Sequence, residues 1–281
     1  MKVLVTGANG QLGYDVINEL NRRGHEAVGV DIAEMDITEG TSVGNVLQCV
    51  KPQAVIHCAA WTAVDAAEDA QNHDKVYDIN VKGTKYIAEQ CGKLGCKMIY
   101  ISTDYVFDGS GSAPWDPDCK AYKPLGWYGE TKLEGELAVS ETLEKYYIVR
   151  TAWAFGRHGN NFVKTMLKLG QTFKEIKVVN DQIGTPTYTP DLARLLVDMV
   201  ETDKYGYYHA TNEGGYISWA DFAKAIFKEA DIDVKVIPVT TEEYGSKALR
   251  PKNSRLDKSK LERNGFRRLP EWYRSLSEFL K

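Results

Sequence analysis

Two side chains one helical turn apart could act together in proton transfer. Tyr128 and Lys132 are four residues apart in the stretch WYGETKLEGE, so a helix there would place both on one face. A free tyrosine has a pKa of about 10 and would need a lowering of about 3 units, on the order of 4 kcal/mol, to serve as an acid or base near pH 7. A desolvated lysine cation nearby could supply much of that shift. An isolated pair of this spacing is more often a surface feature of a charged helix, so its meaning depends on the elements around it.

A glycine-rich stretch near the start of the chain predicts a phosphate-binding turn. The sequence TGANGQLG (residues 6–13) follows an apolar run at residues 1–5 and precedes a segment with helical spacing. Gly7 would let the chain turn sharply, Gly10 would expose backbone N–H groups to a pyrophosphate, and Gly13 would let the helix pack closely on the sheet. The alternative is a tight structural turn, but the position between a strand and an amphipathic helix favours a dinucleotide cradle.

An acidic residue ends the next strand-like run. Asp31 stands about 20 residues beyond the glycines, where an acid is expected to bind the adenosine ribose hydroxyls of NAD. The alternative is an aspartate that caps a turn. No Arg or Lys stands nearby, which disfavours strict dependence on a 2′-phosphate. Asp36 and Ile37 follow closely and could border the adenine.

The fold that would position these residues can be predicted from apolar runs that alternate with helical spacing. The runs are KVLVT, EAVGVDI, AVIHCAA, MIYIST and YYIVRTA. Strands that are apolar on both faces and separated by helices indicate an α/β protein with a doubly wound parallel sheet of Rossmann type. The fourth run ends in hydroxyls, so Ser102 or Thr103 would lie at the carboxyl edge of the sheet, where ligands of such sheets bind.

The alternation of strands and helices becomes less regular beyond about residue 152. We expect a dinucleotide-binding domain over 1–152 with a later return near 178–212, and a smaller α/β substrate-binding lobe over 153–177 and 213–281. Further strand-like runs in this part are IKVVND, YYHATN and VKVIPV, and the helical stretches start near Asn161, Pro190, Ser218 and Pro270.

Composition excludes several classes of function. The chain has 281 residues, 43% hydrophobic and 26% charged, which is typical of a globular protein. Its net charge is −4 and its basic residues are scattered, so a nucleic-acid partner is not expected. The five cysteines form no CxxC pair and no Cys/His ligand spacing, so we expect no metal site. No apolar run is long enough to span a bilayer, and we expect a reducing, cytoplasmic location and no membrane partner.

The cradle, Thr103, Tyr128 and Lys132 together resemble the signature of the extended short-chain dehydrogenase/reductase superfamily. Further segments resemble one family within it, the dTDP-4-dehydrorhamnose reductases: AAWTAVDAAE, STDYVFDG, YGETKLEGE, RTAWAFG, GNNFVKTM, DQIGTPTYTPDLA and RPKNSRL. This resemblance implies hydride transfer from NADPH or NADH to C4 of a dTDP-linked 4-keto-6-deoxy sugar, in the last step of dTDP-rhamnose biosynthesis. It also implies that Thr103 binds the substrate oxygen, that Tyr128 donates the proton, and that Lys132 tunes the tyrosine and holds the nicotinamide ribose.

The same resemblance extends the set of expected contacts. Coenzyme contacts are expected at Gly7, Asn9, Gly10, Gln11, Leu12, Gly13, Asp31, Asp36, Ile37, Ala59, Ala60, Thr62, Tyr128 and Lys132. Substrate contacts are expected at Thr103, Asp104, Tyr105, Trp153, Asn161, Lys164, Arg250 and Arg255. A diphosphate calls for cations and a base for an aromatic platform, which is the independent reason to choose the lysine, the two arginines and Trp153. Trp153 could equally be a core residue, and RPKNSRL could be a solvated turn.

Two histidines and one loop need separate interpretation. His57 lies in a buried strand pattern and is interpreted as a satisfied core histidine, whereas His158, in a glycine-rich loop, is the histidine to examine near substrate. Before Tyr128 the family often shows acids and an Asn, but this chain has Pro117, Cys119 and Gly126, so the loop over the site is expected to be shaped differently.

Other functions remain open at this point. A nucleotide-sugar epimerase would share the cradle and the Tyr–Lys pair, and a non-catalytic regulatory subunit of the methionine adenosyltransferase type would keep the fold and most motifs. A dehydratase of this superfamily usually carries Glu after the Thr–Asp pair, where this chain has Tyr105, so a dehydratase is disfavoured. A homodimer is a candidate assembly.

Overall fold

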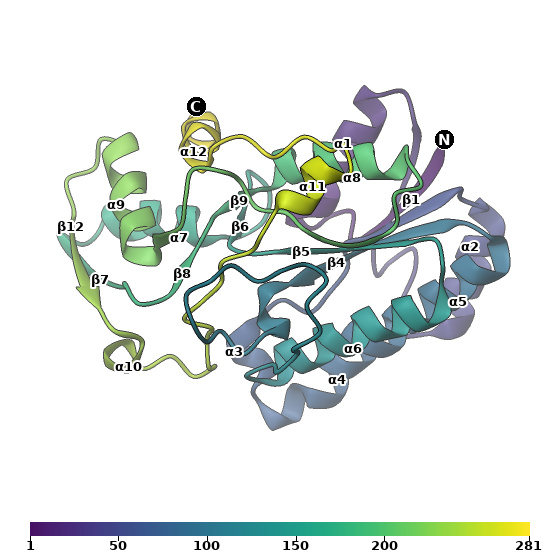
Figure 1. The fold of residues 1–281 in the computed structure, drawn as a ribbon, viewed down its shortest axis with the longest axis horizontal. Helices are drawn as coiled ribbons and strands as arrows, with labels where there is room; N and C mark the ends of the chain where they lie inside the picture. The colour runs from purple at the N-terminus through teal and green to yellow at the C-terminus, as the bar shows by residue number, and fades with distance from the viewer.

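The computed structural model describes all 281 residues and is built around a six-stranded parallel sheet (Figure 1). The strand order is β10-β5-β4-β3-β1-β2, and every neighbouring pair is parallel. The strands are β1 (Lys2–Thr6), β2 (Glu26–Val30), β3 (Ala54–His57), β4 (Lys97–Thr103), β5 (Tyr146–Thr151) and β10 (Gly206–His209). This confirms the predicted doubly wound sheet of Rossmann type. The chain reverses its winding direction between β1 and β3, which is where such sheets bind ligands at the carboxyl ends of the strands.

Alternate side chains of the buried strands pack against helices on opposite faces. Val3 and Val5 belong to one apolar cluster and Leu4 to the other, and all three are fully buried. Figure 1 shows one face covered by α1 (Gln11–Arg22), α8 (Thr189–Val200) and α11 (Ser259–Arg263). The other face is covered by α2 (Gly40–Val50), α4 (His73–Tyr77), α5 (Thr84–Leu94) and α6 (Trp127–Thr142). Burial on both faces explains why these strands read as continuous apolar runs.

A third apolar cluster lies beyond the carboxyl end of the sheet, at the left of Figure 1. Its helices are α7 (Phe162–Gly170), α9 (Trp219–Glu229) and α12 (Trp272–Leu280). Its strands form the pairs β7 (Glu175–Val179) with β12 (Lys235–Val239), β6 (Ala154–Phe155) with β9 (Thr187–Tyr188), and β8 (Ile183–Gly184) with β11 (Ile217–Ser218). A capping box between Ser218 and Asp221 begins α9, because each side chain accepts a hydrogen bond from the other residue's backbone N–H.

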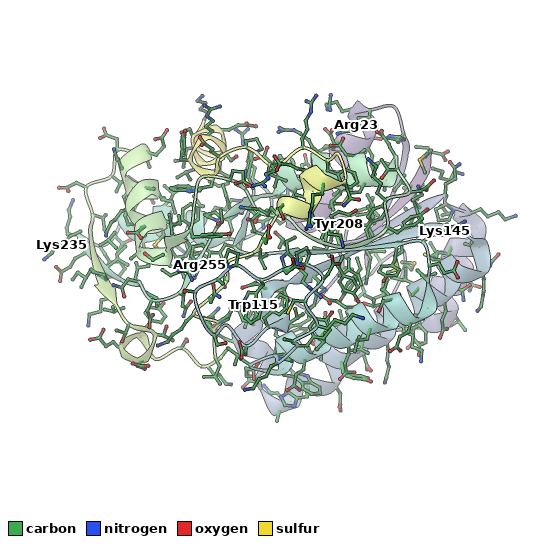
Figure 2. All side chains as sticks on the ribbon, in the orientation of Figure 1. Arg23, Trp115, Lys145, Tyr208, Lys235 and Arg255 are labelled. Carbon is green, nitrogen blue, oxygen red and sulfur yellow. The ribbon has the colours of Figure 1, made fainter.

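We propose to treat this cluster as the smaller lobe and the sheet with its helices as the larger one. The predicted return of the chain to the larger lobe corresponds to α8, which packs on α1, and to β10, which pairs with β5. Strand β7 instead pairs with β12 in the smaller lobe. Figure 2 shows Trp115 and Arg255 together between the two lobes, while Lys145 and Lys235 lie at opposite ends of the molecule.

The remaining short elements are α3 (Val64–Ala67), η1 (Ala70–Asn72), the π-helix η2 (Asp78–Gly83), η3 (Asp104–Val106) and α10 (Thr241–Tyr244). No helix has both the length and the apolar character needed to cross a membrane.

A buried ion pair fixes the loop that precedes α6. The Arg150 guanidinium donates to both carboxylate oxygens of Glu136 at 2.8 and 2.7 Å, and both side chains are fully buried. Arg150 also donates to the Pro117 carbonyl oxygen at 3.2 Å and to the Tyr122 hydroxyl at 3.1 Å. Residues of β5 and α6 therefore hold the loop whose composition departs from the family pattern.

Candidate functional site

The turn between β1 and α1 is an open cradle of backbone. Gly7 has a positive φ of 62°, and a Cβ on it would lie 2.8 Å from the Ala59 nitrogen. A Cβ on Gly13 would lie 2.1 Å from the carbonyl oxygen of Gly7, so only glycine fits there. The first hydrogen bond of α1 runs from the Tyr14 N–H to the Gly10 carbonyl oxygen. The N–H groups before Tyr14 at the start of the helix have no acceptor within the helix, and such groups bind anions well. The residues present fit the pyrophosphate of a dinucleotide.

Gly13→Ala is expected to destabilise the protein by about 1–3 kcal/mol, because its methyl group would displace the backbone of the cradle. The matched control is Gly44→Ala in α2, where the nearest atom to an added Cβ is 3.7 Å away on Gln90. This control should be neutral or stabilising, since Ala favours a helix over Gly. Urea denaturation measures both. Equal stability of the two variants would show that the close approach at Gly13 does not constrain the fold.

The acid at the end of β2 lies against the cradle. One Asp31 carboxylate oxygen accepts from the Asn9 N–H at 3.1 Å, and the other accepts from the Ile32 N–H at 2.9 Å. Glu34 adds a second carboxylate, which accepts from the Asp31 N–H at 3.0 Å. Asp31 therefore stands beside the turn that would hold the pyrophosphate, as a ribose-binding acid must, and it also caps its own turn.

Asp36 and Ile37, the two residues expected at the adenine, make different contacts. The Asp36 carboxylate accepts from the Thr38 N–H and hydroxyl at 2.9 and 2.7 Å, so it stabilises its own turn. Ile37 packs on the π-helix, where a Cβ on Gly83 would lie 2.9 Å from its side chain. Contact of either residue with a coenzyme stays a prediction.

The loop after β3 forms the opposite wall of the cradle. The Ala59 N–H donates to the Thr6 hydroxyl at 3.1 Å, which ties the two loops together. His57 contacts the hydroxyls of Thr6 and Thr84 through its two ring nitrogens at 2.7 and 3.1 Å, and burial lowers its pKa to about 3. It is a satisfied, neutral core histidine. Ala60 and Thr62 continue this loop, and Thr62 is exposed.

The three proposed catalytic residues converge at the carboxyl end of β4. Thr103 is its last residue, Tyr128 and Lys132 lie on α6, and all three side chains are buried. Burial raises the pKa of Tyr128 above its ordinary value, and a hydrogen bond with the Thr103 side chain partly offsets this. A phenol in this environment stays protonated at neutral pH, as a proton donor must.

The ammonium group of Lys132 points toward β4 in this structure, and the expected lowering of the Tyr128 pKa by this cation stays a prediction. The ammonium group donates to the Ile101 carbonyl oxygen at 2.7 Å and lies 4.1 Å from the centroid of the Tyr100 ring. Burial lowers the pKa of Lys132 itself to about 7.

Two buried polar atoms next to this set have no partner. They are the Ser102 hydroxyl oxygen and one carboxylate oxygen of Asp104. The other Asp104 oxygen accepts from the Thr103 hydroxyl at 3.1 Å, and burial raises the pKa of Asp104 to about 6. Because buried polar atoms are nearly always hydrogen-bonded, these orphans point to a polar ligand at this edge.

Tyr105 connects the catalytic set to one of the expected cations. Its ring meets that of Tyr128 edge to face with centroids 5.4 Å apart, and its hydroxyl accepts from Arg250 at 3.3 Å. Arg250 is also paired with Asp65 at 2.5 Å. Sequence reasoning named Arg250 but missed Asp65, whose only signal was its place in the motif AAWTAVDAAE.

The other expected substrate residues are bound into their own surroundings. Lys164 donates to the carbonyl oxygens of Arg157 and Gly159, and Arg255 donates to the Asn253 side chain at 3.0 Å. Trp153 has a positive φ of 52° and stacks on Trp219 with centroids 3.8 Å apart, within the aromatic cluster of the smaller lobe. The structure does not bring these three residues to Tyr128 by any direct contact.

Asn161 and His158 lie at the cradle. The Asn161 amide caps α7 and donates to the Gln11 side chain at 2.8 Å, which joins the smaller lobe to the start of α1. His158 is exposed and stacks on Tyr14 of α1 with centroids 4.2 Å apart.

Comparison with known proteins places this geometry in one family. A family model described as the RmlD substrate binding domain matches residues 1–281. The chain is 40% identical over 280 residues to the spore coat polysaccharide biosynthesis protein SpsK of Bacillus subtilis, covering 100% of this chain and 97% of that one. It is 40% identical over 289 residues to a dTDP-4-dehydrorhamnose reductase of Aggregatibacter actinomycetemcomitans, covering 98% and 97%. A crystal structure of dTDP-4-dehydrorhamnose reductase from Bacillus anthracis in complex with NADP is 44% identical, with a TM-score of 0.95 over 99% of this chain and 98% of that one.

Proposed function

The chain belongs to the RmlD substrate binding domain family, and from this premise we propose that it reduces the C4 keto group of dTDP-4-dehydro-L-rhamnose to give dTDP-L-rhamnose. The coenzyme is NADPH or NADH. The observation that supports the reaction best is the burial of Thr103 and Tyr128 together at the carboxyl end of β4, next to unpartnered polar atoms at the ligand-binding edge of the sheet. The experiment that tests it compares coenzyme oxidised with sugar reduced.

The proposed chemistry divides the two hydrogens between coenzyme and protein. When bound, the reduced nicotinamide supplies a hydride to C4 of the sugar. Tyr128 gives its phenolic proton to O4 as negative charge develops there, and the Thr103 hydroxyl donates a hydrogen bond to the same oxygen. The raised pKa of Tyr128 keeps the proton in place until O4 becomes basic.

Lys132 has a separate part in this mechanism. Its ammonium group binds the Ile101 carbonyl oxygen of β4 and would stabilise the phenolate that remains after proton transfer. The expected contact with the nicotinamide ribose belongs to the same proposal.

Asp31→Ala is expected to shift the ratio of kcat/KM for the two coenzymes toward NADPH. The carboxylate beside Asn9 can accept the ribose hydroxyls of NADH and repels an added 2′-phosphate. Steady-state kinetics with both coenzymes measure the ratio. The control is Glu26→Gln at the start of β2, an exposed acid paired with Lys2, which should leave the ratio unchanged. An unchanged ratio in Asp31→Ala would show that Asp31 does not contact the coenzyme ribose.

The reaction is proposed to run in the cytoplasm, since it consumes a reduced nicotinamide coenzyme and the five cysteines are free thiols. The dTDP-linked sugar is the small-molecule partner. A homodimer stays a prediction.

A further inference from the structure

One carboxylate of the larger lobe binds a segment of the smaller lobe through both of its oxygens. Asp65 stands on the short helix α3, which follows the loop after β3. Its Oδ2 accepts from the Arg250 guanidinium at 2.5 Å, and its Oδ1 accepts from the Ala248 N–H at 3.1 Å. Lys247 pairs with Asp69 one turn further along the chain. Residues 247–250 are thus fastened to α3 and to the residue that precedes η1.

This contact leads directly to the proton donor. Arg250 donates to the Tyr105 hydroxyl at 3.3 Å, and Tyr105 meets Tyr128 edge to face. On the other side, Ala67 of α3 belongs to the same small apolar cluster as Tyr128. Asp65 therefore lies on an element that packs against the proton donor, and it binds the cation that contacts the neighbouring tyrosine.

Arg250 is accessible to a ligand as well as to its protein partners. It lines a cavity of about 450 Å³, together with Leu125, Thr241 and Lys252 among others. A guanidinium carries five N–H donors in a rigid fork, so bonds to Tyr105 and Asp65 leave further N–H groups for an anion. The direction in which the free N–H groups of Arg250 point depends on the carboxylate that binds the guanidinium, which is Asp65.

We propose that Asp65 is a positioning residue for the reaction: it orients Arg250 toward the substrate and holds residues 247–250 against α3. This inference rests on the proposed function, because it assigns the substrate diphosphate as the anion that Arg250 binds. Without the carboxylate, the long arginine side chain would sample other rotamers, and fixing it again on binding costs free energy. The loss falls on substrate binding and not on the proton transfer itself.

The experiment uses Asp65→Asn in the full-length protein. The amide keeps an oxygen to accept from the Ala248 N–H but removes the charge that pairs with Arg250. We expect KM for dTDP-4-dehydro-L-rhamnose to rise by about ten-fold, with kcat changed by less than about three-fold. Calorimetry should show a similar loss of affinity for dTDP-L-rhamnose in the presence of oxidised coenzyme. Because the Asp65 side chain is 51% exposed, the variant should fold normally.

The matched control is Asp74→Asn on α4. Asp74 is an exposed acid in the same part of the chain, and it should leave KM and product affinity at the wild-type values. Unchanged KM and product affinity in Asp65→Asn would overturn the inference. So would a fall in kcat alone.

A double-mutant cycle with Arg250→Gln separates positioning from an independent role. If Asp65 acts through Arg250, Asp65→Asn should add little to the defect of Arg250→Gln, whereas additive losses would contradict the inference. The proposed function is tested separately by the wild type. A wild-type protein that does not reduce the sugar would refute the function, while an active wild type with an unaffected Asp65→Asn would refute only the role of Asp65.

Discussion

Tyr128→Phe is expected to lower kcat by about 10² to 10⁴-fold, because it removes the proton that O4 must receive. The ring is buried among apolar neighbours that include Ala67 and Val76, and phenylalanine preserves that packing. Stability and coenzyme affinity should therefore stay close to wild type. Single-turnover reduction of the sugar measures the chemical step, and quenching of protein fluorescence measures coenzyme binding.

The control for this prediction is Tyr86→Phe. Tyr86 is partly buried against the apolar cluster that contains Leu4 and Val55, and it is not part of the cluster that surrounds Tyr128. The Tyr86→Phe variant should reduce the sugar at the wild-type rate. A Tyr128→Phe variant with a kcat near wild type would end the proposed role of the phenol as acid.

Glu136→Ala is expected to destabilise the protein by about 3–5 kcal/mol, which is the cost of leaving a buried charge without its partner. Arg150 and Glu136 are both fully buried, and the guanidinium has no route to water. The loss should also loosen the loop before α6, since Arg150 binds Pro117 and Tyr122. Urea denaturation followed by far-UV circular dichroism measures the change in free energy of unfolding.

Two further variants serve as controls for Glu136→Ala. Glu130→Ala removes an exposed acid from the same helix and should change stability by less than about 0.5 kcal/mol. Glu136→Gln keeps hydrogen-bond acceptance without the charge and should fall between the two. If Glu136→Ala were as stable as Glu130→Ala, the buried pair could not be what holds β5, α6 and the loop together.

Much of the fold could be predicted because burial leaves a mark on the sequence. The strands of the central sheet are covered on both faces, so KVLVT and MIYIST are apolar throughout and easy to recognise. The helix that carries Tyr128 and Lys132 was predicted from their spacing and confirmed as α6. The Arg150–Glu136 pair could not be found this way, because it joins residues fourteen positions apart on two elements whose register the sequence does not reveal.

The contacts in the candidate site could also be predicted only in part from the sequence. The spacing of Tyr128 and Lys132 predicts that they share a helical face, but it does not say which acceptor an ammonium group will choose. Lys132 binds the Ile101 carbonyl oxygen, and Lys164 of α7 binds carbonyl oxygens of the loop before that helix. Such choices depend on backbone atoms that only the folded structure brings within reach. The role of Asp65 was hidden for the same reason, since its partner lies 185 positions away.

The stoichiometry of coenzyme to sugar tests the proposed reduction most directly. Purified protein is given dTDP-4-dehydro-L-rhamnose and an excess of NADPH or NADH, and the coenzyme oxidised is compared with the dTDP-L-rhamnose formed. A reductase uses one reduced coenzyme for each sugar over many turnovers, whereas an epimerase regenerates its coenzyme within each cycle and a regulatory subunit uses none. We expect equimolar oxidation of coenzyme with accumulation of dTDP-L-rhamnose. Conversion of the sugar with no net oxidation of coenzyme, or folded, coenzyme-binding protein that leaves both untouched, would contradict it.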